Sequence, residues 1–463
     1  MLTERIQWFY KKLGHIRSRF KLTGTQIIAI GFCLIILTGA LLLKLPIASK
    51  SGESEPFVNT LFTATTATCV TGLVVADTYS NWTMFGQIVI LLMIQTGGLG
   101  FMTMAALFAL ALNRRIGLKQ RLLMSESINV SSISGIVRMT RNIILVTVCC
   151  EGLGALFLAT RFIPEFGVAQ GIYKSVFHAI SAFCNAGIDL MGQKQPYSSL
   201  TSYMADPVVN LTICGLIIMG GLGFIVWEDI WHFVKGKRSL RFHTKLVLSI
   251  TALLLGGGMV LILICEWTNP HTIQSLPLLQ KIQAAFFQSV TARTAGFNTL
   301  DIAAMKNSSL FIMMLLMFIG GSPGSTAGGI KTTTFGILIL AAISISRGSS
   351  HVHVFERRVE SKAILRALSI VVISLGILFA GILLLSIFDD LSFTATIFEV
   401  ISAFGTVGLT LGITPELSAP SRVVLILIMY LGRVGVMTAA MAIARRQKAF
   451  EDKLLYPKEE LFL

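Results

Sequence analysis

The sequence predicts an all-α membrane protein of four repeats, each with two transmembrane helices around a short re-entrant helix. Three observations lead to this prediction: the composition, four copies of one phrase, and long apolar runs that alternate with basic stretches. Of 463 residues, 54% are hydrophobic and 13% are charged, and the mean hydropathy is +0.77. Soluble proteins carry about a quarter charged residues, so this composition excludes the soluble classes.

The repeated phrase has a phenylalanine ten positions before a glycine in every copy. The copies read LFTATTATCVTGL (61–73), VFHAISAFCNAGI (176–188), AFFQSVTARTAGF (285–297) and IFEVISAFGTVGL (397–409). Their glycines lie 115, 109 and 112 residues apart. That period suits two membrane helices around a re-entrant segment. Four such units can close a ring of backbone carbonyls, the arrangement with which proteins select dehydrated cations.

Long apolar runs provide the expected transmembrane helices. They fall near 24–45, 84–112, 142–161, 208–234, 246–267, 308–345, 364–388 and 422–444. Each is long enough to cross about 30 Å of hydrocarbon as a helix. The four phrases lie between the members of successive pairs and are too short to cross, so each fits a pore helix that returns as extended chain. The expected segments are 1–23 (cytoplasmic), 24–112, 113–234, 235–345 and 346–444 (the four repeats), and 445–463 (tail).

Basic residues predict the orientation. Of 38 Lys and Arg, 27 fall in the stretches 1–23, 113–141, 235–245, 347–366 and 445–458. Cytoplasmic loops carry such an excess, so both termini are expected in the cytoplasm of a multi-pass cell-membrane protein. The net charge of +15 is spread over loops between spans, which argues against a nucleic-acid partner. The seven cysteines show no metal-ligand spacing.

The residues before each glycine are candidate ion ligands. Backbone carbonyls replace a hydration shell only where the chain turns them inward, and glycine supplies the φ > 0 conformation for this. The preceding half-helices would direct their negative dipole ends at the centre. The candidate selectivity filter is therefore Val70, Thr71, Gly72, Asn185, Ala186, Gly187, Thr294, Ala295, Gly296, Thr406, Val407 and Gly408.

The sixth span is expected to be broken. Its middle reads GGSPGSTAGGIKTTT (320–334), and glycines with a proline at that density do not hold a straight helix. A phosphate-binding loop is excluded, because Ile330 stands where GxxxxGK[ST] requires lysine. Irregular backbone at membrane depth lines a watery cavity, so a gating plug is expected, with a passive kink as the alternative. Its candidate residues are Gly320, Gly321, Gly324, Gly328, Gly329 and Lys331.

Four charged or titratable side chains lie at membrane depth. Arg433, in the eighth span, is expected to face the cavity below the filter and to bond carbonyls of the 320–331 loop, because a buried arginine needs water or a partner. Arg293, three residues before Gly296, would repel cations and is expected to pair behind the filter. His178 and Glu399 hold matched places on two pore helices, where packing behind the filter is the favoured role.

The whole chain resembles the Trk/Ktr/HKT superfamily of potassium transporters, whose subunit has four M1–P–M2 units around a pseudo-fourfold pore. The segments TARTAGFNT (291–299), GGSPGSTAGGIKTTTFG (320–336) and YLGRVG around Arg433 are most similar to the Ktr-type, KtrB-like subunit. The resemblance implies bacterial K⁺ uptake, often sodium-stimulated, with no covalent cofactor. It also implies a homodimer in membrane lipid on a KtrA-like ring of cytosolic nucleotide-binding subunits, and a gating role for Arg433.

Two other classes of membrane protein are less consistent with the sequence. A secondary cation transporter with alternating access normally has inverted, or fewer and larger, repeats, whereas these four share one topology. An intramembrane enzyme is not expected, because the sequence has no HExxH, no paired intramembrane aspartates and no Ser/His arrangement. The sequence leaves K⁺ and Na⁺ open, although glycine at all four filter positions favours K⁺ under the family pattern.

Overall fold

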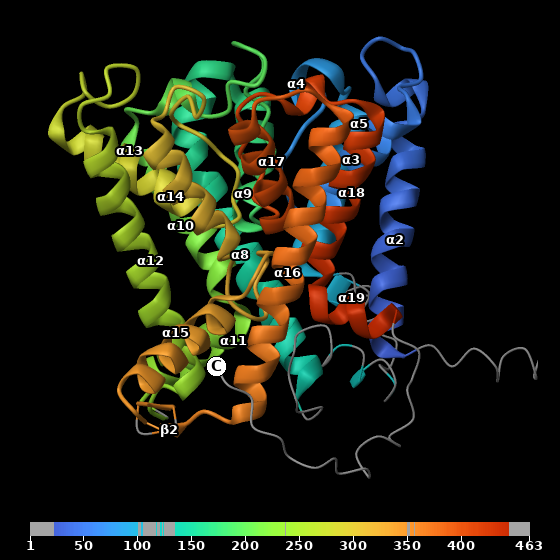
Figure 1. Cartoon of the computed structure of the whole chain (residues 1–463). Coiled ribbons are helices and arrows are strands. Elements are labelled where there is room, and N and C mark those ends of the chain that lie inside the picture. Colours follow the sequence, from blue (N-terminus) through green and yellow to red (C-terminus); the bar gives the residue numbers. More distant parts are fainter. Residues whose placement is uncertain are drawn as a thin grey trace, which may run out of the picture.

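The structure, a computed structural model, describes residues 23–443 apart from 101–102, 105–116, 118–120, 123, 125–134, 237, 350–351 and 356. Within these ranges the helices are accompanied by one hairpin, β1 (His353–Val354) with β2 (Arg357–Arg358), in which His353 pairs with Arg358. Figure 1 shows long helices that run side by side through the height of the molecule. The predicted all-helical class is confirmed.

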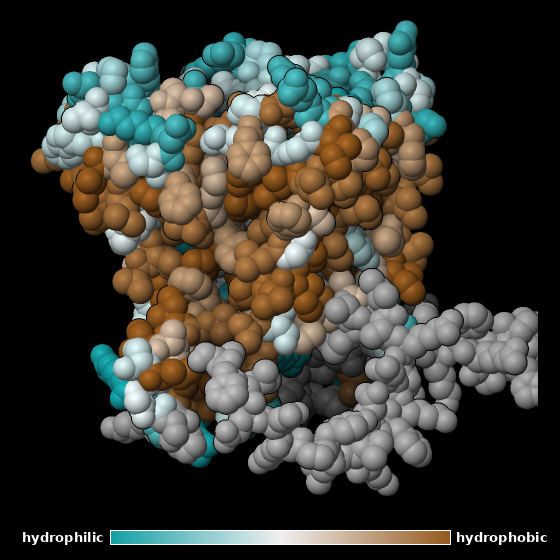
Figure 2. All heavy atoms as spheres, in the orientation of Figure 1, coloured by the Kyte–Doolittle hydropathy of each residue, from teal (hydrophilic) through white to brown (hydrophobic). Residues whose placement is uncertain are grey.

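Four long helices are apolar enough to cross a membrane: α2 (Gly24–Leu43), α8 (Ile136–Phe166), α12 (Phe242–Glu266) and α16 (Ser361–Phe388). At most 33% of the apolar window of each is buried. Their outward apolar side chains, such as Leu156 and Phe379, are 68% and 72% exposed. Figure 2 shows hydrophobic side chains across the middle of the molecule and hydrophilic ones at its upper end. A hydrophobic surface of this extent is expected where lipid covers the protein.

A short helix follows each long one: α3 (Phe57–Thr68), α9 (Val168–Phe183), α13 (Leu278–Thr291) and α17 (Phe393–Gly405). With 12 to 16 residues they are too short to cross a bilayer. Each packs against the long helix before it. The repeated phenylalanine is fully buried in three of them (Phe62, Phe177 and Phe398). In α13 the next residue, Phe287, takes the buried place at 1% exposure.

A third helix completes each set: α5 (Met84–Leu99), α10 (Pro207–Leu222), α14 (Asn307–Phe318) and α18 (Ala419–Val434). The predicted break of the sixth span is confirmed, because α14 ends at Phe318 and α15 (Thr332–Ser346) begins after a non-helical loop. Three more of the apolar runs expected to cross as helices, 84–112, 208–234 and 422–444, are interrupted within the residues that the structure describes. Those helices end at Gly100, Gly223 and Gly435, whose φ values of 80°, 93° and 90° do not continue a helix.

Two of these breaks lead into a further described helix, α11 (Phe224–Val234) and α19 (Val436–Ile443). The chain turns by 97° between α10 and α11. Among the described residues, four single helices are long and apolar enough to span a membrane, and this bent pair is a fifth candidate. The count of eight spans stays a prediction. Shorter elements are η1 (Pro46–Ala48), α4 (Thr78–Asn81), η2 (Thr201–Tyr203) and η3 (Thr414–Glu416).

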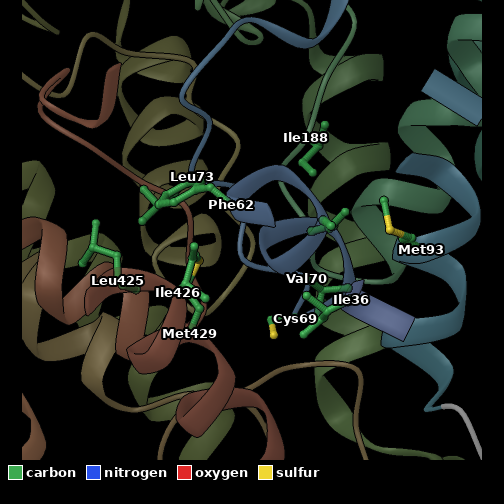
Figure 3. Packing of buried hydrophobic residues seen from close by; sticks show 14 of the residues in the cluster. Ile36, Phe62, Cys69, Val70, Leu73, Met93, Ile188, Leu425, Ile426 and Met429 are labelled. Atoms are coloured by element: carbon green, nitrogen blue, oxygen red, sulfur yellow. The ribbon is translucent and has the colours of Figure 1, made fainter. Parts of the chain in front are cut away.

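The largest buried hydrophobic cluster joins segments far apart in the chain. Figure 3 shows side chains of α18, among them Leu425 and Met429, on one side of α3, with Ile36 of α2 and Met93 of α5 on another. Phe62 and Val70 belong to the same cluster. This packing fixes the position of α3 and of the extended chain after it, which carries part of the candidate site.

Candidate functional site

The four glycines of the repeated phrase meet in a closed ring. A Cβ atom built on each would lie within 2.5 Å of the carbonyl oxygen just before the next glycine. The order is cyclic: Gly72 faces Ala186, Gly187 faces Ala295, Gly296 faces Val407, and Gly408 faces Thr71. The structure therefore brings all twelve predicted filter residues together, and every one of them is buried. We call the four glycines the glycine ring.

Two residues before each glycine, the chain adopts a left-handed conformation. The φ values of Val70, Asn185, Thr294 and Thr406 are 51°, 58°, 67° and 51°. We call these four the base residues. The conformation is unusual for β-branched side chains and costs about 1–2 kcal/mol for a residue other than glycine. Sequence reasoning assigned positive φ to the glycines and missed it here, where it turns the chain from the short helix into the extended strand.

A hydroxyl on each short helix holds the strand that follows. Thr66 and Ser402 accept hydrogen bonds from the backbone N–H of Gly72 (2.9 Å) and Gly408 (3.1 Å). Ser181 donates to the carbonyl of Ile188 at 2.6 Å, and Thr291 donates to the carbonyl of Phe297. Sequence reasoning missed these side chains. The signal was present, since three of the hydroxyls lie four residues after the repeated phenylalanine and the fourth lies one residue later.

The loop between α14 and α15, which is called the 319–331 loop, lies against the base residues. A Cβ atom on Gly328 would come within 2.9 Å of Thr406 Cγ2, and Thr326 Oγ1 donates to the carbonyl of Phe183 at 3.1 Å. The loop is also bonded to the bend between α10 and α11, where Ser322 N donates to Gly221 O (3.0 Å) and Phe224 N donates to Gly324 O (2.9 Å). Of the predicted gating glycines, Gly324 and Gly329 have positive φ, whereas Gly320, Gly321 and Gly328 allow close backbone approach.

Arg433 joins three segments at this loop. Its guanidinium donates to the carbonyls of Thr326 and Gly97, and to that of Gly98 at 3.0 Å. The predicted bond between Arg433 and a carbonyl of the loop is confirmed. Lys331 lies in the same region, and its Nζ donates to Ala327 O at 2.7 Å within the loop.

A cavity of about 240 Å³ lies next to the loop and Arg433. Its lining includes Gly324, Ser325 and Lys331 of the loop and Gly98 and Arg433 of the neighbouring helices. Gly328 of the same loop packs on a base residue, so the loop contacts the ring on one side and lines the cavity on another. Figure 1 shows the segment between α14 and α15 near the middle of the molecule.

The other charged or titratable residues near the ring have structural partners. Arg293 Nη2 donates to the Gly320 carbonyl at 3.3 Å, consistent with pairing behind the filter. Buried Glu399 accepts hydrogen bonds from the hydroxyls of Thr410 (2.7 Å) and Thr414. His178 Nε2 accepts the Leu190 N–H at 3.3 Å. Two of these residues thus hold the chain that leaves the ring.

Sequence reasoning overlooked Glu151, near the middle of α8. It is 8% exposed, and one carboxylate oxygen accepts a hydrogen bond from Gln95 Nε2 at 3.2 Å. The other oxygen is buried and has no hydrogen-bond partner within the part of the chain that the structure describes. Gln95 also accepts a weak bond from Cys184, next to a base residue. A glutamate within an apolar run was the available signal.

Outside the membrane-spanning segments, Asp189 follows Gly187 by two residues. Burial raises the pKa of this carboxyl to about 6. One of its oxygens accepts the Met191 N–H at 2.8 Å. Among the four positions two residues after a ring glycine, a carboxyl is found at Asp189, and the others are Val74, Asn298 and Thr410.

These features define a class: a multi-pass membrane protein with a buried ring of backbone carbonyls at its centre. The model of the TrkH family, described as a cation transport protein, matches residues 4–453. The chain belongs to this family.

Several relatives are similar along nearly the whole chain. The potassium/sodium uptake protein NtpJ of Enterococcus hirae is 42% identical, over 96% of this chain and 98% of that protein. The Ktr system potassium uptake protein B of Bacillus subtilis is also 42% identical, over 96% and 97%. The crystal structure of the potassium transporter TrkH from Vibrio parahaemolyticus aligns with a TM-score of 0.71 at 16% identity. The alignment covers 91% of this chain and 84% of the TrkH chain, which shows a shared fold.

Proposed function

We propose that this chain is the membrane subunit of a potassium uptake system and that K⁺ passes through the glycine ring. The closed, buried ring of four glycines and four facing carbonyls is the observation that carries the proposal. The names of the relatives, which are potassium or potassium/sodium uptake proteins, support the substrate. Sodium occurs in one of those names, and the stimulation by Na⁺ that the resemblance implies is included in the proposal.

The mechanism follows from what a dehydrated cation requires. An ion that enters the ring exchanges water oxygens for backbone carbonyl oxygens, including those of Thr71, Ala186, Ala295 and Val407. The short helices end just before the strands, so their partial negative charges face the ring and favour a cation. The side chains of the four strands can vary without changing the ion ligands, because the backbone supplies those ligands.

The 319–331 loop is proposed as the gate. It lies between the ring and the cavity. Arg433 of α18 donates to the carbonyl of Thr326 in this loop and also to carbonyls of α5. An ion that leaves the ring toward the cavity has to pass this loop. Conduction therefore requires the loop to move, and the fixed charge of Arg433 adds a barrier while the loop stays in place.

The same proposal includes the expected assembly and topology. The four sets of long, short and third helices correspond to four M1–P–M2 repeats around a pseudo-fourfold axis, with the boundaries predicted from the sequence. Both termini are then cytoplasmic. Three relatives are named as parts of a Ktr system, which supports a KtrA-like regulatory partner. The proposal adds that the chain forms a homodimer on a ring of such subunits.

The test is growth and ⁸⁶Rb⁺ uptake in cells that lack their own potassium uptake systems. With its regulatory partner present, the wild-type chain should restore growth at low potassium, whereas Gly296→Ser should lose affinity or selectivity for K⁺. A wild type that carries no potassium under these conditions would exclude the proposal. A serine variant indistinguishable from wild type would exclude the ring as the path.

A further inference from the structure

Thr326 uses all three of its polar groups to bond different parts of the molecule. Its N–H donates to Gly220 O (3.2 Å) at the end of α10, and its carbonyl accepts from Arg433 of α18. Its hydroxyl lies 3.1 Å from Phe183 O and 3.2 Å from Asn185 Oδ1. Because the side chain is fully buried, water does not replace these bonds while the loop stays in place.

Asn185 is the partner that belongs to the ring. It is a base residue, and its amide nitrogen lies 3.4 Å from the hydroxyl of the neighbouring base residue Thr294. Both of its partners are hydroxyls, which donate and accept, so the amide bridges them in either orientation. The side chain thus links a strand of the ring to the loop 141 residues further along the chain.

The other base residues have no such bond to the loop. The side chain of Val70 has no polar atom, and the Thr294 hydroxyl bonds Asn185 itself. Thr406 packs on Gly328, but its hydroxyl is buried without a hydrogen-bond partner among the described residues. Among the base residues, the hydrogen bond between side chain and loop is therefore made at Asn185.

We infer that Asn185 and Thr326 form a latch that holds the 319–331 loop against the glycine ring and that breaks when the path opens. The inference rests on the proposed function, since it names how the ring and the gate of that path are coupled. Arg433 binds the carbonyl of Thr326 and Asn185 binds its hydroxyl, so the two contacts are independent and each can be removed alone. The latch makes the state of the ring and the position of the loop depend on each other.

The test is a double-mutant cycle with Thr326→Val and Asn185→Val. The first variant keeps the shape, N–H and carbonyl of Thr326 and removes only the hydroxyl. The second places at Asn185 the residue that position 70 carries at a similar φ of 51°. Each single variant should raise basal ⁸⁶Rb⁺ uptake, measured without the regulatory partner, about fivefold. That factor corresponds to about 1 kcal/mol for one neutral hydrogen bond. The double variant should gain no more than the larger single one.

A matched cycle provides the control. Thr332→Val also removes a hydroxyl from this region, but that hydroxyl lies 3.0 Å from Ser322 Oγ and not next to Asn185. Its effect should add to that of Asn185→Val. Thermal unfolding midpoints of the purified variants should show the same pattern, coupled for the pair 185 and 326 and additive for 185 and 332.

Additive effects of Thr326→Val and Asn185→Val in both assays would overturn the latch. Coupled unfolding midpoints without a change in basal uptake would also overturn it, because the contact would then be structural only. In either case a wild type that takes up potassium leaves the proposed function standing. A wild type without uptake would remove the proposed function, and with it the gating role of the latch.

Discussion

Gly408→Ala is the substitution that probes the geometry of the glycine ring most sharply. The added Cβ would lie 2.7 Å from Gly72 Cα and closer still to the carbonyl oxygen of Thr71. Ordinary contacts begin near 3.4 Å, so one ligand carbonyl has to move. The loss of a bond between a carbonyl and a charged partner costs about 1.5–3 kcal/mol, which is roughly 10- to 100-fold in apparent affinity for K⁺.

Gly412→Ala is the matched control for backbone strain. Gly412 has φ 94°, close to the 91° of Gly408, but a Cβ there would meet nothing within 4 Å. Both variants therefore carry the strain of a left-handed alanine, and only the first disturbs the ring. The assay is ⁸⁶Rb⁺ uptake against external K⁺ in uptake-deficient cells at matched expression. Equal defects in the two variants, or normal K⁺ affinity in Gly408→Ala, would refute the reasoning.

Three further predictions concern packing, a buried acid and the gate. Gly220→Ala should lower the free energy of unfolding by about 1–3 kcal/mol, because its Cβ would overlap a backbone carbonyl of α9. Gly215→Ala on the same helix meets nothing within 4 Å and should leave the unfolding midpoint unchanged or raised, so equal midpoints for the two variants would contradict the packing. Glu151→Gln should keep the contact with Gln95 and yield folded protein, whereas Glu151→Lys should not, because it places a charged ammonium in a buried site at membrane depth. Similar yields in size-exclusion chromatography would count against this. Arg433→Ala should raise basal ⁸⁶Rb⁺ uptake, and Arg433→Lys should raise it too, since an ammonium lacks the planar fork that reaches separate carbonyls. Unchanged basal uptake in both variants would exclude the gating role.

Local patterns predicted the ring and the broken helix. The repeated phrase placed a glycine at the same point of each strand, and the structure brings Gly72, Gly187, Gly296 and Gly408 together. The density of glycine around Pro323 predicted the end of α14 and the start of α15. The cost of a buried charge predicted that Arg433 would bond the loop.

What the sequence did not reveal depends on contacts between distant residues. The left-handed conformation of Thr406 is imposed by the turn between the short helix and the strand, against the preference of a β-branched residue. The helix ends at Gly100, Gly223 and Gly435 are a second case, because a glycine in an apolar run suits close helix packing as well as a helix end. The bond between Asn185 and Thr326 joins two sequence neighbourhoods that share no motif.

The most direct test of the ring as an ion path is ⁸⁶Rb⁺ uptake into potassium-loaded liposomes that contain the purified chain. The account predicts uptake that follows the K⁺ electrochemical gradient in symmetric Na⁺ and at equal pH, and that external K⁺ inhibits far more strongly than Na⁺. Uptake that stops without a sodium or proton gradient, or that moves a second ion in fixed stoichiometry, would contradict it and would favour a coupled transporter with alternating access.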